Sequence, residues 1–171
     1  MKKPVFSTYE ILKTWALNED IDRRWIDWAQ EMMEAGFESD DLYILAGITP
    51  PYNQFELLEL TNSVLQDLGL VFADSEKVIK NYAYSIVKTA LVKPGDHFSI
   101  LEELNRIYYA LDRDRNYQDF SMLYYAKDDL NSSPDQWYWK SATRENIDDI
   151  IKTEFQKYTD AFEADKSNLL F

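Results

Sequence analysis

The sequence predicts an all-α fold, an irregular bundle of seven to eight helices packed around a central helix at about residues 75–92. Hydrophobic residues make up 46% of the 171 positions and aromatic residues 15%, enough to build a substantial core. Only 4 glycines and 5 prolines are present, whereas a fold of many strands needs tight turns at short intervals. Apolar residues also recur at helical spacing along most of the chain.

The central helix is predicted by pairs of apolar residues that recur every four positions. They are Val78 and Ile79, Tyr82 and Ala83, Ile86 and Val87, and Ala90 and Leu91. At about 100° per residue these positions cover more than half of the helix circumference, so we expect neighbours on several sides. Ser75 can cap the N-terminus of this helix, and Pro94-Gly95 follows its end.

Four helices are predicted before the central one, at about residues 8–17, 21–35, 42–46 and 54–68. Each follows a residue whose side chain can accept a hydrogen bond from the first turn. These expected caps are Ser7, then Asn18 or Asp20, then Ser39, then Asn53. The residues expected to face inward are Ile11, Leu12, Trp15, Ile21, Trp25, Trp28, Ala29, Met32, Phe55, Leu57, Leu58, Val64, Leu65 and Leu68.

Three further helices are predicted after the central one. Asp96 is expected to cap the sixth, the loop 112–116 leads into the seventh, and Thr143 is expected to cap the last. Residues 131–134 form a loop by composition, and Trp137-Tyr138-Trp139 is expected to be irregular. We expect Leu169, Leu170 and Phe171 to be able to dock after a frayed segment that begins near residue 165.

No linker or fixed-period repeat divides the chain, which favours a single helical domain over residues 1–171. There is no cysteine, so disulfides and thiol chemistry are excluded. No apolar run reaches the length of a signal peptide core or of a membrane span. We therefore expect a cytoplasmic protein that does not enter the membrane.

The net charge of −13 is unevenly distributed. Residues 17–74 contain 13 acidic and 2 basic residues, a net charge of −11, which favours a basic protein partner. Nucleic acid is disfavoured as a partner, because binding phosphates needs a concentrated basic face.

No recognisable catalytic or metal-binding motif is present, and we predict no cofactor, no metal and no catalytic residue. Asp112, Asp114 and Asn116 match the start of a calcium loop, but Tyr117 and Leu123 replace its required glycine and glutamate. A single histidine cannot build the paired sites of zinc or di-metal helical proteins. Pairs of neighbouring carboxylates are common, as 31 acidic residues make inevitable.

Two sets of residues are candidates for binding a partner. Asp20, Asp27, Glu31 and Glu34 are expected to line one face of the second helix, with Arg23 able to pair with Asp27. Acidic side chains that repel one another are relieved by a cationic partner, which they also steer. An ordinary solvated helix face is the alternative interpretation.

The second set consists of tyrosines beside other aromatic residues. In each of Tyr108-Tyr109, Tyr124-Tyr125 and Trp137-Tyr138-Trp139, one ring is expected to lie in the core. Tyr109, Tyr125 and Tyr138 are then the candidates for an interface. The alternative is that they are partly buried edge rings whose hydroxyls reach water.

Several segments show a resemblance to known proteins. The segment 39–47, followed by Pro50-Pro51 and Phe55-Glu56, together with 137–139 and 142–147, resembles small, acidic, helical bacterial proteins of unknown function. Some chains of that type resemble immunity proteins, which neutralise a cognate toxin by binding it. The resemblance covers about a third of the chain and implies a cytosolic binding protein, with no functional residue carried over.

The leading hypothesis is a non-enzymatic protein-binding module, immunity-like, whose acidic helical surface and exposed aromatic residues meet a basic partner. The alternative is a small-ligand-binding protein or an acid–base enzyme with an interhelical pocket of carboxylates and aromatic rings. A structural homo-oligomer is a third hypothesis.

Overall fold

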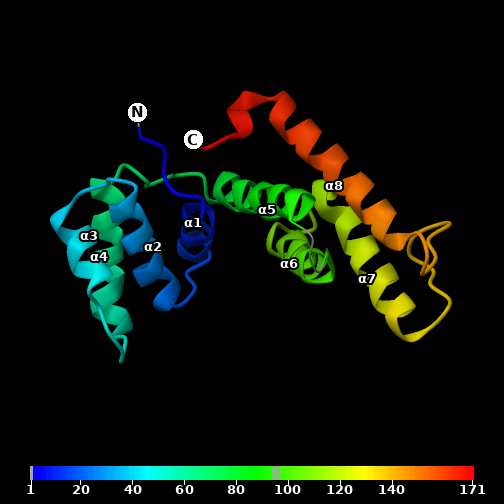
Figure 1. The fold of residues 1–171 in the computed structure, drawn as a ribbon, viewed down its shortest axis with the longest axis horizontal. Coiled ribbons are helices and arrows are strands. Elements are labelled where there is room, and N and C mark those ends of the chain that lie inside the picture. The colour runs from blue at the N-terminus through cyan, green and yellow to red at the C-terminus, as the bar shows by residue number, and fades with distance from the viewer. Residues whose placement is uncertain (1, 94, 96) are drawn as a thin grey trace. The chain divides into compact units, whose positions relative to one another are not determined.

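The computed structural model describes residues 2–93, 95 and 97–171, and within them it contains eight α-helices, two short 3₁₀ turns and no strand (Figure 1). The all-α prediction and the predicted number of helices are confirmed. The helices are α1 (Thr8–Ala16), α2 (Arg23–Glu34), α3 (Asp40–Ala46), α4 (Gln54–Asp67), α5 (Ser75–Val92), α6 (His97–Ala110), α7 (Gln118–Ser132) and α8 (Ile147–Ala164). The 3₁₀ turns are η1 (Arg115–Tyr117) and η2 (Lys166–Asn168).

The chain divides into two compact units by its internal contacts. Unit 1 contains Met1–Tyr82 together with Leu170–Phe171, and unit 2 contains Ala83–Leu169. The division falls inside α5, which is one continuous helix. The single domain over residues 1–171 therefore stays a prediction.

Helix α5 has the boundaries that the sequence predicts, Ser75 to Val92. Of its eight paired apolar positions, Val78, Ile79, Ala83 and Val87 are buried, and the other four are half-buried. Asn81, Tyr84 and Ser85 are buried as well, so the middle of the helix is covered on more sides than the apolar pattern alone indicates. The expected cap at Asp96 lies outside the described residues.

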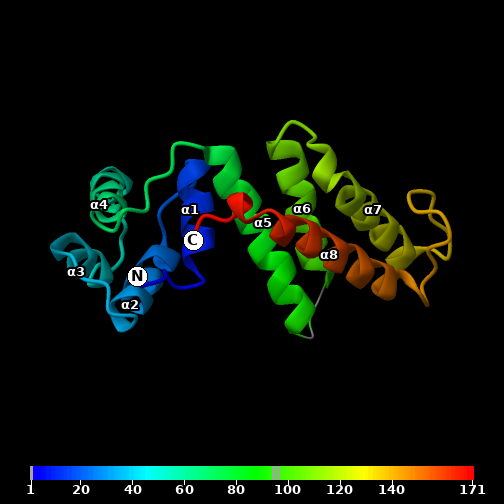
Figure 2. The same cartoon turned by 90° about the horizontal axis from the view of Figure 1, so that it is seen from above.

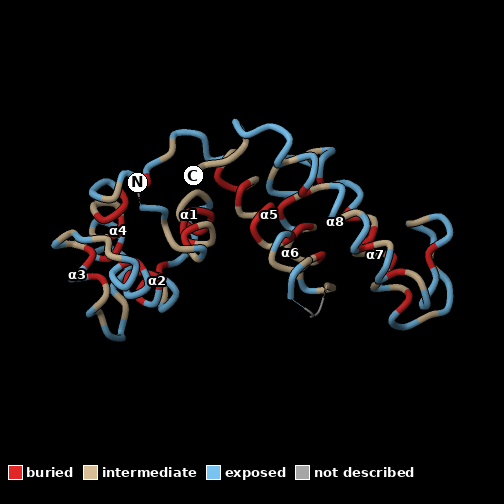
Figure 3. The backbone as a smooth tube through the Cα atoms, turned by 45° about the horizontal axis from the view of Figure 1, so that its top comes forward, coloured by how far each residue is buried: buried red, intermediate tan, exposed pale blue. Residues whose placement is uncertain are grey.

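The core of unit 1 is built from α1 to α4 and the first turns of α5. Trp25 and Trp28 lie at its centre, with their rings edge to face at 5.8 Å. The Trp28 Nε1–H donates to the Thr8 hydroxyl at 2.9 Å, which satisfies a buried polar group. Buried and exposed stretches alternate along these helices, as expected when each turns one side to the core (Figure 3).

Three helix starts in unit 1, those of α1, α2 and α5, differ from the sequence-based expectation. Asp74 and not Ser75 caps α5, because Ser75 is already the first helical residue and the Asp74 side chain accepts from Lys77 N at 2.9 Å. Ser7 does precede α1, but its hydroxyl donates to Glu31 of α2 and makes no capping bond. Helix α2 is capped by Asp22, which accepts from Arg24 N at 2.9 Å, so neither Asn18 nor Asp20 serves as the cap. The reason is that Asn18 adopts a left-handed conformation, φ 52°, at the end of α1, and the backbone does not become helical again until after Asp22.

The prediction of which α4 residues face the core is only partly correct. Leu57, Val64 and Leu65 are buried, but Phe55 and Leu58 are 75% and 51% exposed. Thr61 takes the buried position one turn after Leu57, and its hydroxyl donates to the Leu57 carbonyl at 2.8 Å. This internal bond makes a polar side chain acceptable in the core.

The C-terminal residues dock as the sequence suggests. The Phe171 ring stacks on Tyr9 of α1 at 4.8 Å, and Leu170 N donates to the Asn81 amide oxygen at 3.1 Å. Residues 166–168 form η2, capped by Asp165, where a frayed segment was expected. The tail therefore belongs to the core of unit 1 and explains why Asn81 is buried on α5.

Unit 2 contains the second half of α5 with α6, α7 and α8, and α7 and α8 run side by side (Figure 2). An aromatic group fills its core: Phe120 of α7 contacts Phe155 and Tyr158 of α8 edge to face. Tyr117 is buried, and its hydroxyl lies 3.2 Å from that of Tyr158. Burial in this group raises the pKa of Tyr158.

Helix α8 begins at Ile147, and the residue before it is Asn146, where the sequence favours Thr143 as the cap. The Asn146 side chain turns back into the preceding loop, accepting from Thr143 N at 2.7 Å and donating to the Ser141 carbonyl at 2.9 Å. These bonds close the loop instead of capping the helix.

A hydrogen-bonded ion pair joins α5 to α8 within unit 2 and predicts a pH-dependent stability. Glu163 accepts from Lys88 Nζ and from the Tyr84 hydroxyl, both at 2.6 Å, and these bonds lower the pKa of Glu163. A lowered pKa means stabilisation that is present above the ordinary carboxyl pKa and is lost as the pH falls through the folded-state value. We expect Glu163→Gln to lower the Tm at neutral pH and to match the wild type once the pH protonates Glu163.

Circular dichroism melts over a pH series test this expectation. Tyr84→Phe, which removes one of the two donors, should cause a smaller loss at neutral pH. A Glu163→Gln variant whose Tm differs from the wild type equally at all pH values would contradict it.

Candidate protein-binding surface

The three tyrosines that the sequence predicts as interface residues lie together in unit 2. Tyr109 belongs to α6, Tyr125 to α7, and Tyr138 to the loop 133–146 between α7 and α8. The rings of Tyr125 and Tyr138 stack at 5.3 Å. A hydrogen bond between the side chains of Tyr109 and Tyr125 raises the pKa of Tyr109. Residues from three separate elements thus form one group, although whether they bind a partner stays a prediction.

Neighbouring rings extend this group. Tyr108 contacts Tyr109 at 5.1 Å, and Tyr124 contacts Tyr125 at 5.2 Å. We call Tyr108, Tyr109, Tyr124, Tyr125 and Tyr138 the tyrosine surface. Tyr109 is 51% exposed and Tyr138 42%, whereas Tyr108, Tyr124 and Tyr125 are half-buried, so two of the five residues are largely open to a partner. Tyrosine suits such a position because its ring is apolar and its hydroxyl remains hydrated.

Charged side chains border the tyrosine surface. The Arg113 guanidinium lies over the Tyr109 ring, 5.9 Å from its centre. Burial and the nearby carboxylates of Glu102 and Asp128 raise the pKa of Tyr124. Aromatic residues with a charged rim are the composition that protein interfaces favour.

The loop 133–146 carries the most exposed aromatic side chain among the described residues, Trp137, at 92%. Sequence reasoning named Tyr138 and not Trp137, because an irregular segment has no periodicity that tells which ring faces outward. The neighbouring Trp139 is half-buried. The difference in exposure between Trp137 and Trp139 is set by the path of the loop backbone.

The side chain of Gln136 fixes that backbone. Its amide oxygen accepts from Tyr138 N at 2.9 Å and Trp139 N at 2.8 Å, and its nitrogen donates to the carbonyls of Trp139 at 2.6 Å and Ala142 at 3.1 Å. All four hydrogen-bonding positions of the amide are therefore used. The indole of Trp137 is presented on a loop that is already ordered.

The predicted acidic row is only partly correct. Asp27, Glu31 and Glu34 are exposed on α2, and Arg23 pairs with Asp27 at 3.3 Å as expected. Asp20 lies before the helix, because α2 starts at Arg23, and it borders a cleft of unit 1. The acidic face therefore has three members and not four.

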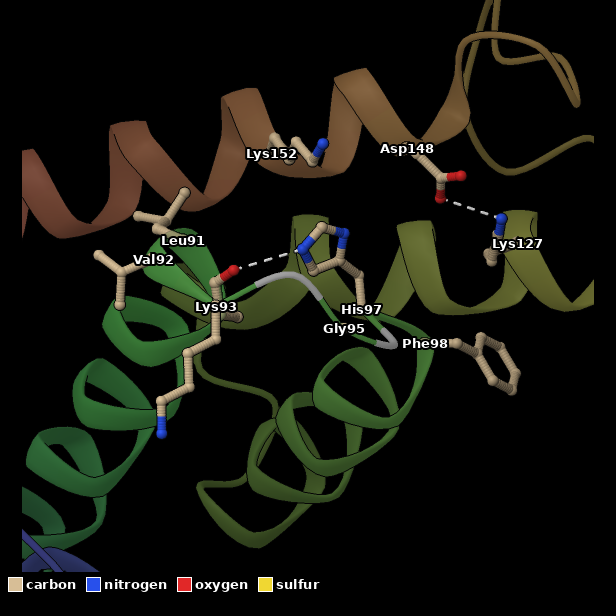
Figure 4. Close-up of a pocket in the computed structure, with 10 residues that line it drawn as sticks. Leu91, Val92, Lys93, Gly95, His97, Phe98, Lys127, Asp148 and Lys152 are labelled. Carbon is tan, nitrogen blue, oxygen red and sulfur yellow. Dashed lines mark hydrogen bonds and ion pairs between the residues drawn. The ribbon is translucent and has the colours of Figure 1, made fainter.

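A second cleft, of about 560 Å³, lies in unit 2 beside the start of α6 (Figure 4). The His97 ring stands near the centre of the residues drawn, with Nε2 3.4 Å from the Ala90 carbonyl oxygen, and Lys127 pairs with Asp148 at 3.0 Å. Pro94 and Asp96, which flank Gly95 of this cleft, lie outside the described residues.

No cluster of three or more metal-ligating side chains occurs in the described part of the chain. Asp114 of the calcium-like segment caps η1 by accepting from Asn116 N at 2.9 Å. In the same described part, no helix is both long and apolar enough to cross a membrane.

Comparisons with family models, with curated proteins and with solved structures find no match to this chain.

Proposed function

We propose that this chain is a non-enzymatic protein-binding module that contacts a basic protein partner through Trp137 and the tyrosine surface. The observation that carries the proposal is the exposure of Trp137, 92%, on a loop whose backbone Gln136 holds with four hydrogen bonds. A side chain presented on an ordered loop loses little conformational freedom on binding.

Energetics favour burial of this side chain in a complex. Burying apolar area contributes about 25 cal/mol per Å², so covering an exposed tryptophan is worth several kcal/mol before the cost of association. Tryptophan and tyrosine are also enriched among residues whose removal costs a complex about 2 kcal/mol or more. Trp137 is therefore the expected central contact, and the tyrosine surface, to which Tyr138 of the same loop belongs, is the expected second contact.

Charge supports a basic partner. Unit 1 contains 15 acidic and 7 basic residues, and unit 2 contains 16 and 11, so each unit is negative by itself. A field of one sign attracts partners of the opposite sign and raises the association rate. Asp27, Glu31 and Glu34 are exposed and add to the negative field of unit 1 that would attract such a partner.

An immunity-like role, the neutralisation of a basic protein by binding it, agrees with the resemblance described for the segments 39–47, 137–139 and 142–147. It also agrees with the exposed position of Trp137, which lies within one of these segments.

Replacing Trp137 by alanine is the direct test. Proteins captured from an extract of the source organism by the wild-type chain are identified, and the retained protein is purified and titrated by calorimetry. We expect Trp137→Ala to weaken binding about 30-fold, the equivalent of about 2 kcal/mol. The combined change of Asp27, Glu31 and Glu34 to lysine should weaken it further and reduce its dependence on salt.

The matched control is Phe55→Ala, since Phe55 is a 75% exposed ring on α4 of the other unit. It should bind like the wild type. An acidic partner, or equal binding by the Trp137→Ala variant, would count against the proposal. So would concentration-dependent dimerisation that Trp137→Ala abolishes, because the surface would then belong to a second copy of this chain.

A further inference from the structure

The last two residues of the chain dock on unit 1. Leu170 and Phe171 are half-buried and pack against the core of that unit, whereas the preceding Leu169 belongs to unit 2. The Phe171 ring stacks on Tyr9 of α1 at 4.8 Å, with 28° between the ring planes. The Leu170 N–H donates to the amide oxygen of Asn81 on α5 at 3.1 Å. We call Leu170 and Phe171 the docked pair, and Tyr9 and Asn81 the docking site.

Other contacts hold the docking site in shape. The Asn81 side chain is 0% exposed, and its amide nitrogen donates to the Lys77 carbonyl at 2.9 Å. Because its own helix holds the nitrogen, the amide oxygen keeps one orientation and is available to a main-chain N–H. The Phe6 ring contacts that of Tyr9 edge to face at 5.7 Å. A buried acceptor and an aromatic ring together bind an extended segment through its backbone and one side chain.

The docked pair lies in a part of the chain that can open without global unfolding. Residues 163–167, which lead to it, are exposed, and the pair itself is only half-buried. Leu169 is extended, with φ −72° and ψ 145°, so release of the pair does not unwind α8. Chain ends with little buried surface open at a small fraction of the free energy of global unfolding.

An empty docking site is unfavourable. Release of the pair uncovers the Tyr9 ring and removes one hydrogen bond from the buried Asn81 oxygen. Replacement of the pair by an equivalent segment avoids this loss. The structure shows that the sequence Leu170-Phe171 fits, and a second copy of this chain carries the same sequence.

We infer that the docking site also receives the Leu170-Phe171 pair of a second copy of this chain, so that reciprocal exchange of the pairs joins two copies. The contacts at the site are the same in both arrangements. The equilibrium therefore depends on the effective concentration of the tethered pair, which is on the order of millimolar for a short linker. Residues 165–169 provide the reach between copies, about 17 Å when extended.

A chain that ends at Asn168 tests the site directly, because it keeps the docking site and lacks the pair. The acetylated peptide of residues 165–171 is added, and the side-chain amide of Asn81 is followed by proton–nitrogen NMR. We expect binding with a dissociation constant on the order of 1 mM, since the pair is small and half-buried. The same peptide with Phe171→Ala should bind about tenfold weaker, because it lacks the stacked ring.

Two variants of the protein test exchange between copies. The chain that ends at Asn168 has a site without a pair, and Tyr9→Ala weakens the site and frees its own pair. Mixed at about 1 mM, the two should form a 1:1 complex in NMR diffusion measurements, while each alone remains monomeric. The matched control is Tyr43→Ala, at a 45% exposed tyrosine of α3 in the same unit, which should form no complex.

The wild type by itself should form dimers as its concentration approaches the millimolar range. Deletion of residues 169–171 should abolish them, and Trp137→Ala should leave them unchanged. The opposite pattern would overturn the inference and assign self-association to the surface around Trp137.

The inference also fails if the peptide leaves the Asn81 amide unshifted at millimolar concentration, if the Phe171→Ala peptide binds equally well, or if the mixed variants remain monomeric. Should the chain that ends at Asn168 not fold, Phe171→Ala in the full chain replaces it in both tests. That variant removes the stacked ring and keeps the backbone hydrogen bond of Leu170.

Discussion

Replacing Trp28 by alanine is expected to lower the free energy of unfolding by about 3–5 kcal/mol. The ring is buried at the centre of unit 1, in edge-to-face contact with Trp25 at 5.8 Å. Alanine removes this contact, leaves a cavity that the fixed helices cannot fill, and deprives the Thr8 hydroxyl of its donor. Urea unfolding followed by circular dichroism measures the change.

Phe55→Ala is the control for this experiment, because it removes a large aromatic side chain of the same unit that is 75% exposed. Its effect should stay within about 0.5 kcal/mol. A Trp28→Ala variant that loses less than about 1.5 kcal/mol would show that the core of unit 1 repacks readily.

Replacing Phe155 by alanine should cost unit 2 a similar amount, about 3–5 kcal/mol. Phe155 is buried on α8, its ring contacts Phe120 at 5.6 Å, and the His97 ring lies against it at 5.8 Å. Removal of the ring therefore opens the aromatic core that holds α7 and α8 together. The same urea titration measures the loss, and Val92→Ala, at a 76% exposed position of α5, is the matched control with little effect.

The two core variants together test the domain organisation. If residues 1–171 unfold as one domain, each variant shifts a single transition, which we expect because α5 contributes buried residues to both units. Separate unfolding would appear as two transitions, of which Trp28→Ala moves one and Phe155→Ala the other. That result would contradict the predicted single domain.

Much of the helical architecture could be predicted because it depends on local periodicity. The apolar pairs between Val78 and Leu91 predict α5 with its observed boundaries, and Ser39 and Asn53 cap α3 and α4 as expected. The predicted caps of α1, α2, α5 and α8 are wrong. Asp22 caps α2, and Asn146 precedes α8, because the preceding turns decide where the backbone first becomes helical.

The candidate binding residues could be predicted from the sequence only in part. The interface tyrosines could be named from pairs of adjacent rings, but their mutual contact joins residues 109, 125 and 138, which no local pattern connects. Trp137 was missed because the Gln136 hydrogen bonds that turn it outward belong to an irregular loop. No sequence pattern indicates that the buried Trp25 N–H lacks an acceptor, since burial and hydrogen-bond partners are properties of the packed unit.

Helical periodicity, glycine content and charge are read residue by residue, and they suffice to predict an all-helical, acidic chain without thiol chemistry. Packing sets which rings are exposed, that Asp20 borders a cleft and does not belong to the acidic row, and that the Trp25 N–H has no hydrogen-bond partner among the described residues. Exposure and hydrogen-bond satisfaction depend on neighbours far away in the chain, which only the folded protein brings together.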